Sequence, residues 1–424
     1  MIGRNGSPLR GWKMLVLLLV VLALLAVLIY QLPPVKQRLS WRLDFAMAYI
    51  RGVLNPVEAL PTAFPTPEAP LLTPTPAATF TSTLPPATPT VTPELSPTPT
   101  PSPTPLPASV ILGAPPFDKQ DINNCGPATL ALHLRMFGWE GDQFTIAEEI
   151  KSIRADRNVN VEELVYYVRN FAGWLNIEYR VGGDMDTLRG LLAAGLPVMI
   201  EEGFPIQESY WPNDDRWAGH YLLVTGYDDA SQSFMTQDSF EGPNRWISYT
   251  ALDRTWQQFN RVYIILFPPD QTETVKTVLG ANWDPDANRR HALEVSKQET
   301  QSDPNNAFAW FNLGTNQVYF DRYKEAALSY DKAREIGLPQ RMLRYQFGPF
   351  MAYFHSLRTE DLLALTDYAL QRTPNSEEAL LWQGWGRYRN GDSAGALESF
   401  QKALEERPGY DDALYGINYV QSNG

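Results

Sequence analysis

Proline divides this chain into regions that cannot all fold in the same way. Of its 35 prolines, 16 lie between Pro61 and Pro107, together with 13 threonines. Proline fixes φ and donates no backbone hydrogen bond, and the stretch offers few side chains for a core, so we expect it to be extended and unfolded. At ~3.1 Å per residue, such a tract spans at most on the order of 140 Å. We predict a disordered Pro/Thr-rich linker over residues 61–108.

An uncharged apolar run lies near the N-terminus, between Met14 and Ile29. With Trp12 and Tyr30 at its ends it has about 19 residues, close to the ~20 that a helix needs to cross a bilayer. A cleaved signal peptide is the alternative, but no small residues of a cleavage site follow Ile29. We therefore predict a retained transmembrane helix within residues 1–34.

The charges around this run leave its orientation nearly balanced under the positive-inside rule. Arg4, Arg10 and Lys13 precede it, and Lys36, Arg38, Arg42 and Arg51 follow it. A Pro/Thr stalk typically carries a domain away from a membrane surface, which favours a cytoplasmic N-terminus and extracytoplasmic C-terminal domains. Residues 39–54, within a juxtamembrane segment 35–60, fit an amphipathic helix that lies either on the lipid surface or against the protein itself.

The single cysteine, Cys125, excludes an intrachain disulfide and a cysteine-rich zinc site. Asn123 and Asn124 are N-cap residue types, Pro127 suits a first helical turn, and the residues up to Gly138 are apolar almost all round. These features predict a buried helix that starts at Cys125. The helix dipole favours a thiolate there. A lone cysteine is more often an inert core residue, but the polar residues before this one and the Gly-Pro after it do not fit a core.

A thiol nucleophile needs a base, and histidine is the usual one. His133 lies about two helical turns beyond Cys125, ~12 Å away, which is too far for a hydrogen bond. His291 and His355 fall in the helical C-terminal region and receive no role. His220 remains, at the start of a predicted strand, Gly219–Tyr227.

A hairpin follows from this strand, because the turn Asp228–Gln232 leads into a second strand, Ser233–Asp238. If the hairpin is centred on Ala230, paired residue numbers sum to 460, and Asp238 lies opposite Leu222. It is then diagonal to His220 on the same face, where a carboxylate can accept the ring N–H. A register slip of one residue would move Asp238 to the other face. Asp228 and Asp229 are explained by the turn itself.

Together these residues resemble a known family. Gln120, Cys125-Gly-Pro-Ala, Gly219-His220-Tyr and Gln237-Asp238-Ser, in this order, are similar to the C39-like peptidases, which have the papain-like fold; the resemblance covers roughly residues 111–269. It implies that Cys125 is the nucleophile, His220 the general base and Asp238 its orienting group. Gln120 and the backbone N–H of Cys125 would hold the oxyanion. No metal or cofactor is implied.

The rest of residues 109–269 agrees with an α+β order, with helices before the sheet. Helices are predicted at 161–171 and 185–194, and strands at 111–112, 196–201 and 261–267. The segment from Glu202 to Trp217 carries tryptophan and tyrosine. It either lines a substrate cleft or forms a surface loop.

Residues 270–424 contain a period. Glycines 280, 314, 348 and 384 lie 34, 34 and 36 residues apart, and Ala326, Tyr330 and Ala333 recur as Ala396, Phe400 and Ala403. The pattern resembles tetratricopeptide repeats, which form an all-α solenoid. We expect about four repeats, the third of them (341–375) degenerate, and a capping helix at Asp411–Val420. Such arrays commonly bind a peptide or protein partner, although one can also serve as a spacer.

These observations predict a membrane-anchored extracytoplasmic cysteine peptidase with a helical-repeat domain that binds substrate or a partner protein. The net charge of −13 disfavours nucleic acid as a partner. Two alternatives remain: a non-catalytic peptide-binding adaptor, or another thiol acyl-transfer enzyme on the same fold, such as an amidase or a transpeptidase-like enzyme.

Overall fold

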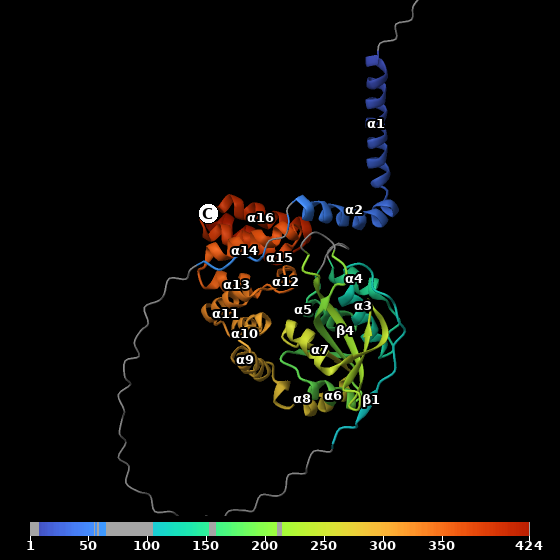
Figure 1. Ribbon diagram of the computed structural model, residues 1–424, viewed down its shortest axis with the longest axis vertical. Coiled ribbons are helices and arrows are strands. Elements are labelled where there is room, and N and C mark those ends of the chain that lie inside the picture. Colours follow the sequence, from blue (N-terminus) through green and yellow to red (C-terminus); the bar gives the residue numbers. More distant parts are fainter. Residues whose placement is uncertain are drawn as a thin grey trace, which may run out of the picture.

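The structure, a computed structural model, describes residues 8–54, 56, 59–64, 105–151, 158–209 and 214–423. Most of the predicted linker, residues 65–104, lies outside the described residues. Figure 1 shows a sheet flanked by helices, an array of paired helices beside it, and two N-terminal helices.

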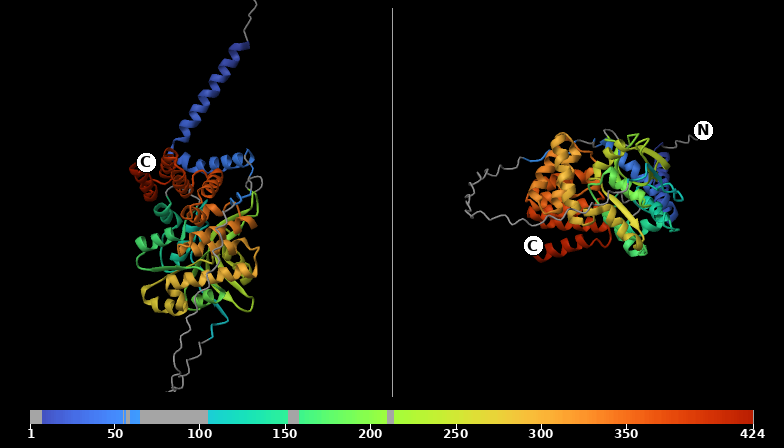
Figure 2. Two further views of the ribbon diagram at one scale, coloured as in Figure 1. Left: turned by 90° about the vertical axis from the view of Figure 1, so that its left-hand side faces the viewer. Right: turned by 90° about the horizontal axis from the view of Figure 1, so that it is seen from below.

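The two N-terminal helices are α1 (Pro8–Tyr30) and α2 (Pro33–Leu54). Within α1, the 19 residues from Trp12 to Tyr30 have a mean hydropathy of 2.9, and 0% of this window is buried. Figures 1 and 2 show α1 projecting away from the folded body. Its length and composition allow it to cross a membrane, and a signal sequence would satisfy the same criteria.

Among the described residues, the sheet has seven strands in the order β2-β7-β3-β4-β5-β6, with β1 paired to β4, and every pairing among them is antiparallel. The strands are β1 (Ser109–Ile111), β2 (Asn176–Arg180), β3 (Val198–Pro205), β4 (Trp217–Asp228), β5 (Ser233–Asp238), β6 (Gly242–Ser248) and β7 (Tyr263–Phe267).

Helices cover both faces of this sheet. One core joins the sheet to α3 (Cys125–Arg135), α4 (Gln143–Ile150) and α5 (Val161–Phe171). A second core, on the opposite face, joins it to α6 (Met185–Ala193), α7 (Tyr249–Trp256) and α8 (Thr272–Leu279). Short 3-10 turns lie at Gln257–Phe259, Pro269–Gln271 and Gly280–Trp283. The α+β architecture expected for this region is thus confirmed.

Several predicted elements coincide with the observed ones. One predicted helix begins at Cys125, as observed. The predicted helix 161–171 and the predicted strand Ser233–Asp238 have the observed limits at both ends. The strand predicted at 196–201 begins instead at Val198 and continues to Pro205, so the first part of the predicted loop 202–217 is strand. Asn124 occupies the N-cap position, but its side chain makes no capping bond. It donates to Gln143 Oε1 at 2.8 Å instead.

The register of the β4–β5 hairpin changes along its length. Near its open end Leu223 pairs with Gln237, so the numbers sum to 460 as predicted. Near the turn Tyr227 pairs with Phe234, one residue out of that register, and a bulge between Val224 and Gly226 makes up the difference. Without the bulge, the register at the turn would place Asp238 opposite Leu223, on the face away from His220.

The C-terminal region is an array of antiparallel helix pairs. It comprises α9 (Pro285–Ser302), α10 (Ala307–Tyr319), α11 (Tyr323–Ile336), α12 (Met342–Tyr345), α13 (Gly348–His355), α14 (Thr359–Arg372), α15 (Glu377–Arg389), α16 (Ser393–Glu406) and α17 (Asp411–Asn423). The complete pairs are α10/α11, α13/α14 and α15/α16, and α9 and α17 pack at the two ends of this set. The described residues therefore contain three full pairs rather than about four repeats. The pair with the shortest first helix is the one predicted to be degenerate.

The repeating small and aromatic residues pack as tetratricopeptide patterning predicts. A Cβ on Gly314 would lie 2.8 Å from the ring of Tyr330, and one on Gly384 would lie 2.6 Å from that of Phe400. Both rings are fully buried. The glycines thus allow each first helix to approach the aromatic residue of its partner helix, which explains the spacing seen in the sequence.

The sheet region and the helical array share one continuous core. The cluster on the α3 face extends from residues such as Leu130 and Tyr221 through Phe311 and Tyr330 to Ala379. Polar contacts join the same two regions: Asn260 Nδ2 donates to Asn316 Oδ1 at 2.8 Å. The array therefore packs directly on the sheet region (Figure 2).

Candidate active site

Cys125 is the first residue of α3 and is half-buried. Nine of the helix's 11 residues, Gly126–Leu134, are buried, so its N-terminus is held by the core. Thr129 Oγ1 donates to the Tyr221 carbonyl at 3.1 Å, which fixes the helix over β4. His133 is buried and bonds the Pro197 carbonyl through Nε2 at 3.1 Å. It is a packed residue, and burial lowers its pKa to about 3.

The side chains of His220 and Asp238 meet at the open end of the β4–β5 hairpin. His220 Nε2 lies 2.9 Å from Asp238 Oδ1, and both side chains are buried. The same carboxylate oxygen accepts the backbone N–H of Phe240 at 2.7 Å and that of Glu241 at 3.0 Å. The hydrogen bonds from this turn hold the carboxylate in place, and the carboxylate in turn orients the ring.

The thiol of Cys125 lies close enough to the His220 ring for each group to shift the pKa of the other. Because Nε2 already binds Asp238, Nδ1 is the nitrogen left for the thiol. Burial acts to raise the pKa of Cys125, but the hydrogen bond and charge of His220 outweigh it, and the net pKa is lowered. Burial acts to lower the pKa of His220, but Asp238 and Cys125 raise it to about 10. Both shifts favour a thiolate–imidazolium pair at neutral pH.

Gln120 is bonded to Ser239, the residue that follows Asp238. Its Oε1 accepts from Ser239 Oγ at 2.8 Å, and its backbone N–H donates to the Ser239 carbonyl at 2.8 Å. These two bonds tie Gln120 to the residue that follows Asp238. Since Ser239 occupies the amide oxygen, the amide Nε2 group is the end that remains to donate to a ligand.

One aromatic ring packs against the imidazole, and a second packs against the first. Phe204, on β3, lies with its ring centroid 5.0 Å from that of His220, and Phe240 lies 5.6 Å from Phe204 in an edge-to-face arrangement. Apolar rings beside an ion pair exclude water and strengthen the electrostatic interaction between its members. The sequence analysis did not identify these two residues.

Comparison with known proteins relates the region that holds these residues to a known family. Residues 111–264 match the Peptidase_C39 like family. This part of the chain is a C39-like domain. Among curated proteins, no match to the chain is found.

Solved structures similar to parts of the chain include a protein described as a C39-like peptidase from Bacillus anthracis. The two chains are 19% identical, the match covers 38% of this chain and 97% of that one, and the TM-score is 0.31. Xylellain, a cysteine protease from Xylella fastidiosa, is 16% identical, with 38% and 87% coverage and a TM-score of 0.29. YrrB, described as a TPR protein, is 22% identical, with 32% and 69% coverage and a TM-score of 0.29.

A second buried acid of the C39-like domain lies beside His220. Glu202, on β3, pairs in register with His220 on β4 and accepts a hydrogen bond from Thr255 Oγ1 at 2.5 Å. Burial raises the pKa of Glu202 to about 7; Thr255 and His220 act to lower it, and Asp238 and Glu241 raise it further. The sequence analysis placed Glu202 in a loop and missed it. The strand pairing that brings it to His220 is a long-range contact.

Glu202→Gln is expected to stabilise the protein at pH 8 but not at pH 5. In the folded protein the pKa is about 7, against 4.5 for an ordinary glutamate, so the folded state loses stability relative to the unfolded chain as pH rises between these values. A neutral glutamine removes this loss. We expect a Tm increase of about 2–4 °C at pH 8, the effect of ~1 kcal/mol in a domain of this size. Thermal melts of both proteins at both pH values measure it. An equal shift at pH 5 would contradict the assignment.

The helical array holds the segment just before His220. Arg341 lies 2.7 Å from Asp214 Oδ1 and 2.8 Å from Asp215 Oδ1, and it donates to the Trp217 carbonyl at 2.8 Å. The Trp217 ring packs edge-to-face on Tyr345 of α12, with centroids 5.8 Å apart. The degenerate repeat thus positions the start of β4. Nothing in the local sequence around Arg341 signals this contact.

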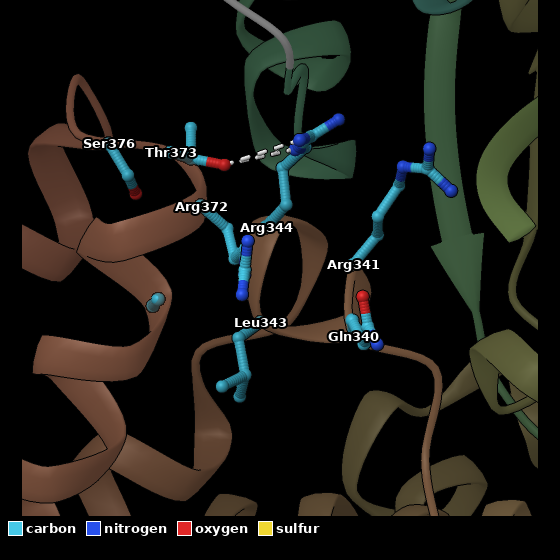
Figure 3. A pocket seen from close by; sticks show the side chains of 8 residues that line it. Gln340, Arg341, Leu343, Arg344, Arg372, Thr373 and Ser376 are labelled. Atoms are coloured by element: carbon cyan, nitrogen blue, oxygen red, sulfur yellow. Dashed lines mark hydrogen bonds between the residues drawn. The ribbon is translucent and has the colours of Figure 1, made fainter. Parts of the chain in front are cut away.

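A small pocket lies within the helical array. It is lined by Gln340, Arg341, Leu343, Arg344, Ala369, Arg372, Thr373 and Ser376. Figure 3 shows Arg344 hydrogen-bonded to Thr373, with Nη2 3.2 Å from Oγ1. The lining includes none of Gln120, Cys125, His220 and Asp238. The pocket is therefore a feature of the array rather than part of the Cys–His–Asp cluster.

Proposed function

We propose that this protein is a membrane-anchored cysteine peptidase that hydrolyses peptide bonds through Cys125, His220 and Asp238. The observation that carries the proposal is the chain of contacts from thiol to imidazole to carboxylate, with 2.9 Å between His220 Nε2 and Asp238 Oδ1. In a C39-like domain, this arrangement supplies a nucleophile, a proton carrier and an orienting acid.

Catalysis would proceed by acyl transfer. The Cys125 thiolate attacks the carbonyl carbon of the scissile peptide, and the amide of Gln120 and the backbone N–H of Cys125 donate to the oxyanion. The imidazolium of His220 gives its proton to the leaving amine as the carbon–nitrogen bond breaks. A water then loses a proton to His220 and attacks the thioester; the carbon–sulfur bond breaks, which releases the acid and regenerates the thiolate–imidazolium pair. Asp238 orients the ring and stabilises its positive charge throughout.

The membrane anchor is supported by α1. No part of the Trp12–Tyr30 window is buried by the described protein, and an apolar helix of this length needs another apolar environment. We propose that the membrane supplies this environment and that α1 crosses it. The N-terminus would be cytoplasmic, and the C39-like domain and helical array would lie outside. The array would bind peptide or protein, either substrate or partner.

Replacing His220 with alanine is expected to slow labelling of Cys125 by a thiol-reactive peptide probe about 100-fold or more, since the thiol loses the cation that lowers its pKa. Labelling rates measured at pH 7 by mass spectrometry report this directly. His291→Ala, at an exposed position on α9, is the matched control and should label at the wild-type rate.

Equal labelling rates in wild type and His220→Ala would favour the non-catalytic adaptor. Product analysis with a peptide and an added amine separates the remaining alternatives. A peptidase releases the free acid, whereas a transpeptidase-like enzyme transfers the acyl group to the amine. Release of ammonia from side-chain amides would identify an amidase.

A further inference from the structure

The two described ends of the Pro/Thr-rich tract are both attached to the same folded body. On the N-terminal side, the backbone N–H of Phe64 donates to Asp361 Oδ1 at 3.1 Å, on α14 of the helical array. On the C-terminal side, Tyr227 Oη donates to the Pro107 carbonyl at 2.6 Å, and β1 follows at once, paired with β4. Residues 65–104 therefore join one point on the array to one point on the C39-like domain.

The N-terminal attachment is a specific contact rather than a single bond. We call Pro56 and residues 59–64 the docked segment. Within it, Leu60 is only 7% exposed and belongs to the main hydrophobic core. The Pro61 carbonyl accepts from Arg334 Nε at 2.9 Å, and the Pro56 carbonyl accepts from Arg372 Nη2 at 2.9 Å. Three carbonyl or amide groups and one apolar side chain thus hold this segment.

The array depends on the docked segment for its own hydrogen bonding. Arg334 is 5% exposed and forms an ion pair with Asp361 at 3.3 Å. Its Nη1 also donates to Tyr353 Oη at 2.8 Å, whereas its Nε and Nη2 both donate to Pro61. Removing the segment would leave those two buried donors without an acceptor, which is costly for a charged group. A proline-containing segment outside any helix or strand suits this task because its carbonyls are not used in a helix or sheet.

We propose that the helical array is the receptor for the chain's own N-terminal anchor. The docked segment starts two residues after the end of α2, so it holds the C39-like domain next to α1 and α2. The Pro/Thr-rich tract then closes a loop between two attached points, and its length does not set the distance between anchor and peptidase. In this proposal the tract does not act as a stalk. The proposal concerns how the anchor is held and does not depend on catalysis.

The test is to cut the loop in the full-length protein. A site-specific protease sequence is inserted within residues 65–104, an affinity tag is placed at the N-terminus, and the protein is purified in detergent and cleaved. We expect the fragment that contains residues 105–424 to stay bound to the tagged N-terminal fragment. A stalk predicts the opposite, because cleavage would release it. Release from the wild-type protein would overturn the proposal.

Leu60→Asp is expected to release the C-terminal fragment after cleavage, since it places a charge in the core. Leu54→Asp is the matched control, because Leu54 ends α2 with 73% exposure and should leave the fragments together. Retention in Leu60→Asp would contradict the assigned contact.

A synthetic peptide of residues 56–64, added in excess to the cleaved wild-type protein, tests the contact without a destabilised variant. It should release the fragment, whereas the same peptide carrying Leu60→Asp should not, and failure of the unaltered peptide to compete would also count against the proposal.

Discussion

Replacing Cys125 with serine is expected to abolish peptide hydrolysis. The hydroxyl is close in size to the thiol, but it cannot form an ion pair with His220, because its pKa is far above that of a thiol held by an imidazolium. Loss of the nucleophile in such a site lowers kcat by about four orders of magnitude or more. Hydrolysis of a fluorogenic peptide, with Tm measured in parallel, checks this expectation.

The serine variant should remain folded. Cys125 is half-buried at the end of α3, and nine buried residues behind it hold the helix, so the substitution removes little packing. An unchanged Tm with lost hydrolysis is the expected combination. Hydrolysis that persists within tenfold of wild type would show that another group is the nucleophile.

Asp238→Ala is expected to lower kcat/KM by about 10²–10³-fold, whereas Asp238→Asn should cost less and change the pH profile instead. Alanine removes the acceptor that orients His220, at 2.9 Å. Asparagine keeps an acceptor oxygen for the ring and for the N–H groups of Phe240 and Glu241, but it removes the negative charge. Comparing the two variants therefore separates orientation from charge.

The direction of the pH change follows from the pKa of His220. Asp238 contributes to raising that pKa to about 10, so removing its charge lowers the pKa, and the imidazolium is lost at a lower pH. The alkaline limb of kcat/KM in Asp238→Asn should move to lower pH, and pH–rate profiles measure it. Asp229→Asn, in the same hairpin but bonded to Tyr249, is the control and should leave the profile unchanged. An unmoved alkaline limb in Asp238→Asn would show that Asp238 does not control the ring.

The start of α3 shows what the local sequence can predict and what it cannot. Polar residues, a Gly-Pro pair and an apolar run predicted a buried helix beginning at Cys125, and the helix begins there. The same reasoning expected Asn124 to cap it, yet that side chain binds Gln143, 19 residues further along. Helix position depends on residues within one or two turns, whereas the choice of a side-chain partner depends on which element packs nearby.

In the hairpin that carries His220, the local sequence likewise predicted the elements but not the detail of their pairing. Alternation and turn residues predicted both strands, and the summed register is correct where Leu223 meets Gln237. The bulge between Val224 and Gly226 was not predicted, because an unpaired residue inside an apolar run leaves no local mark. Only the folded hairpin shows that this bulge is what keeps Asp238 on the face of His220.

The sequence by itself determined the type and approximate position of many elements of this protein. These include the apolar N-terminal helix, the cysteine at a helix start, the strands that carry His220 and Asp238, and the small and aromatic positions of the array. All of them follow from periodicity and from residue preferences over a few turns or strand positions. The tertiary structure decided which distant residues meet. Glu202 reaches His220 through strand pairing, Arg341 holds the start of β4, and Arg334 binds Pro61 across 273 residues. Such contacts are selected by burial and by the need to satisfy buried charges in the complete fold, and no local pattern encodes them.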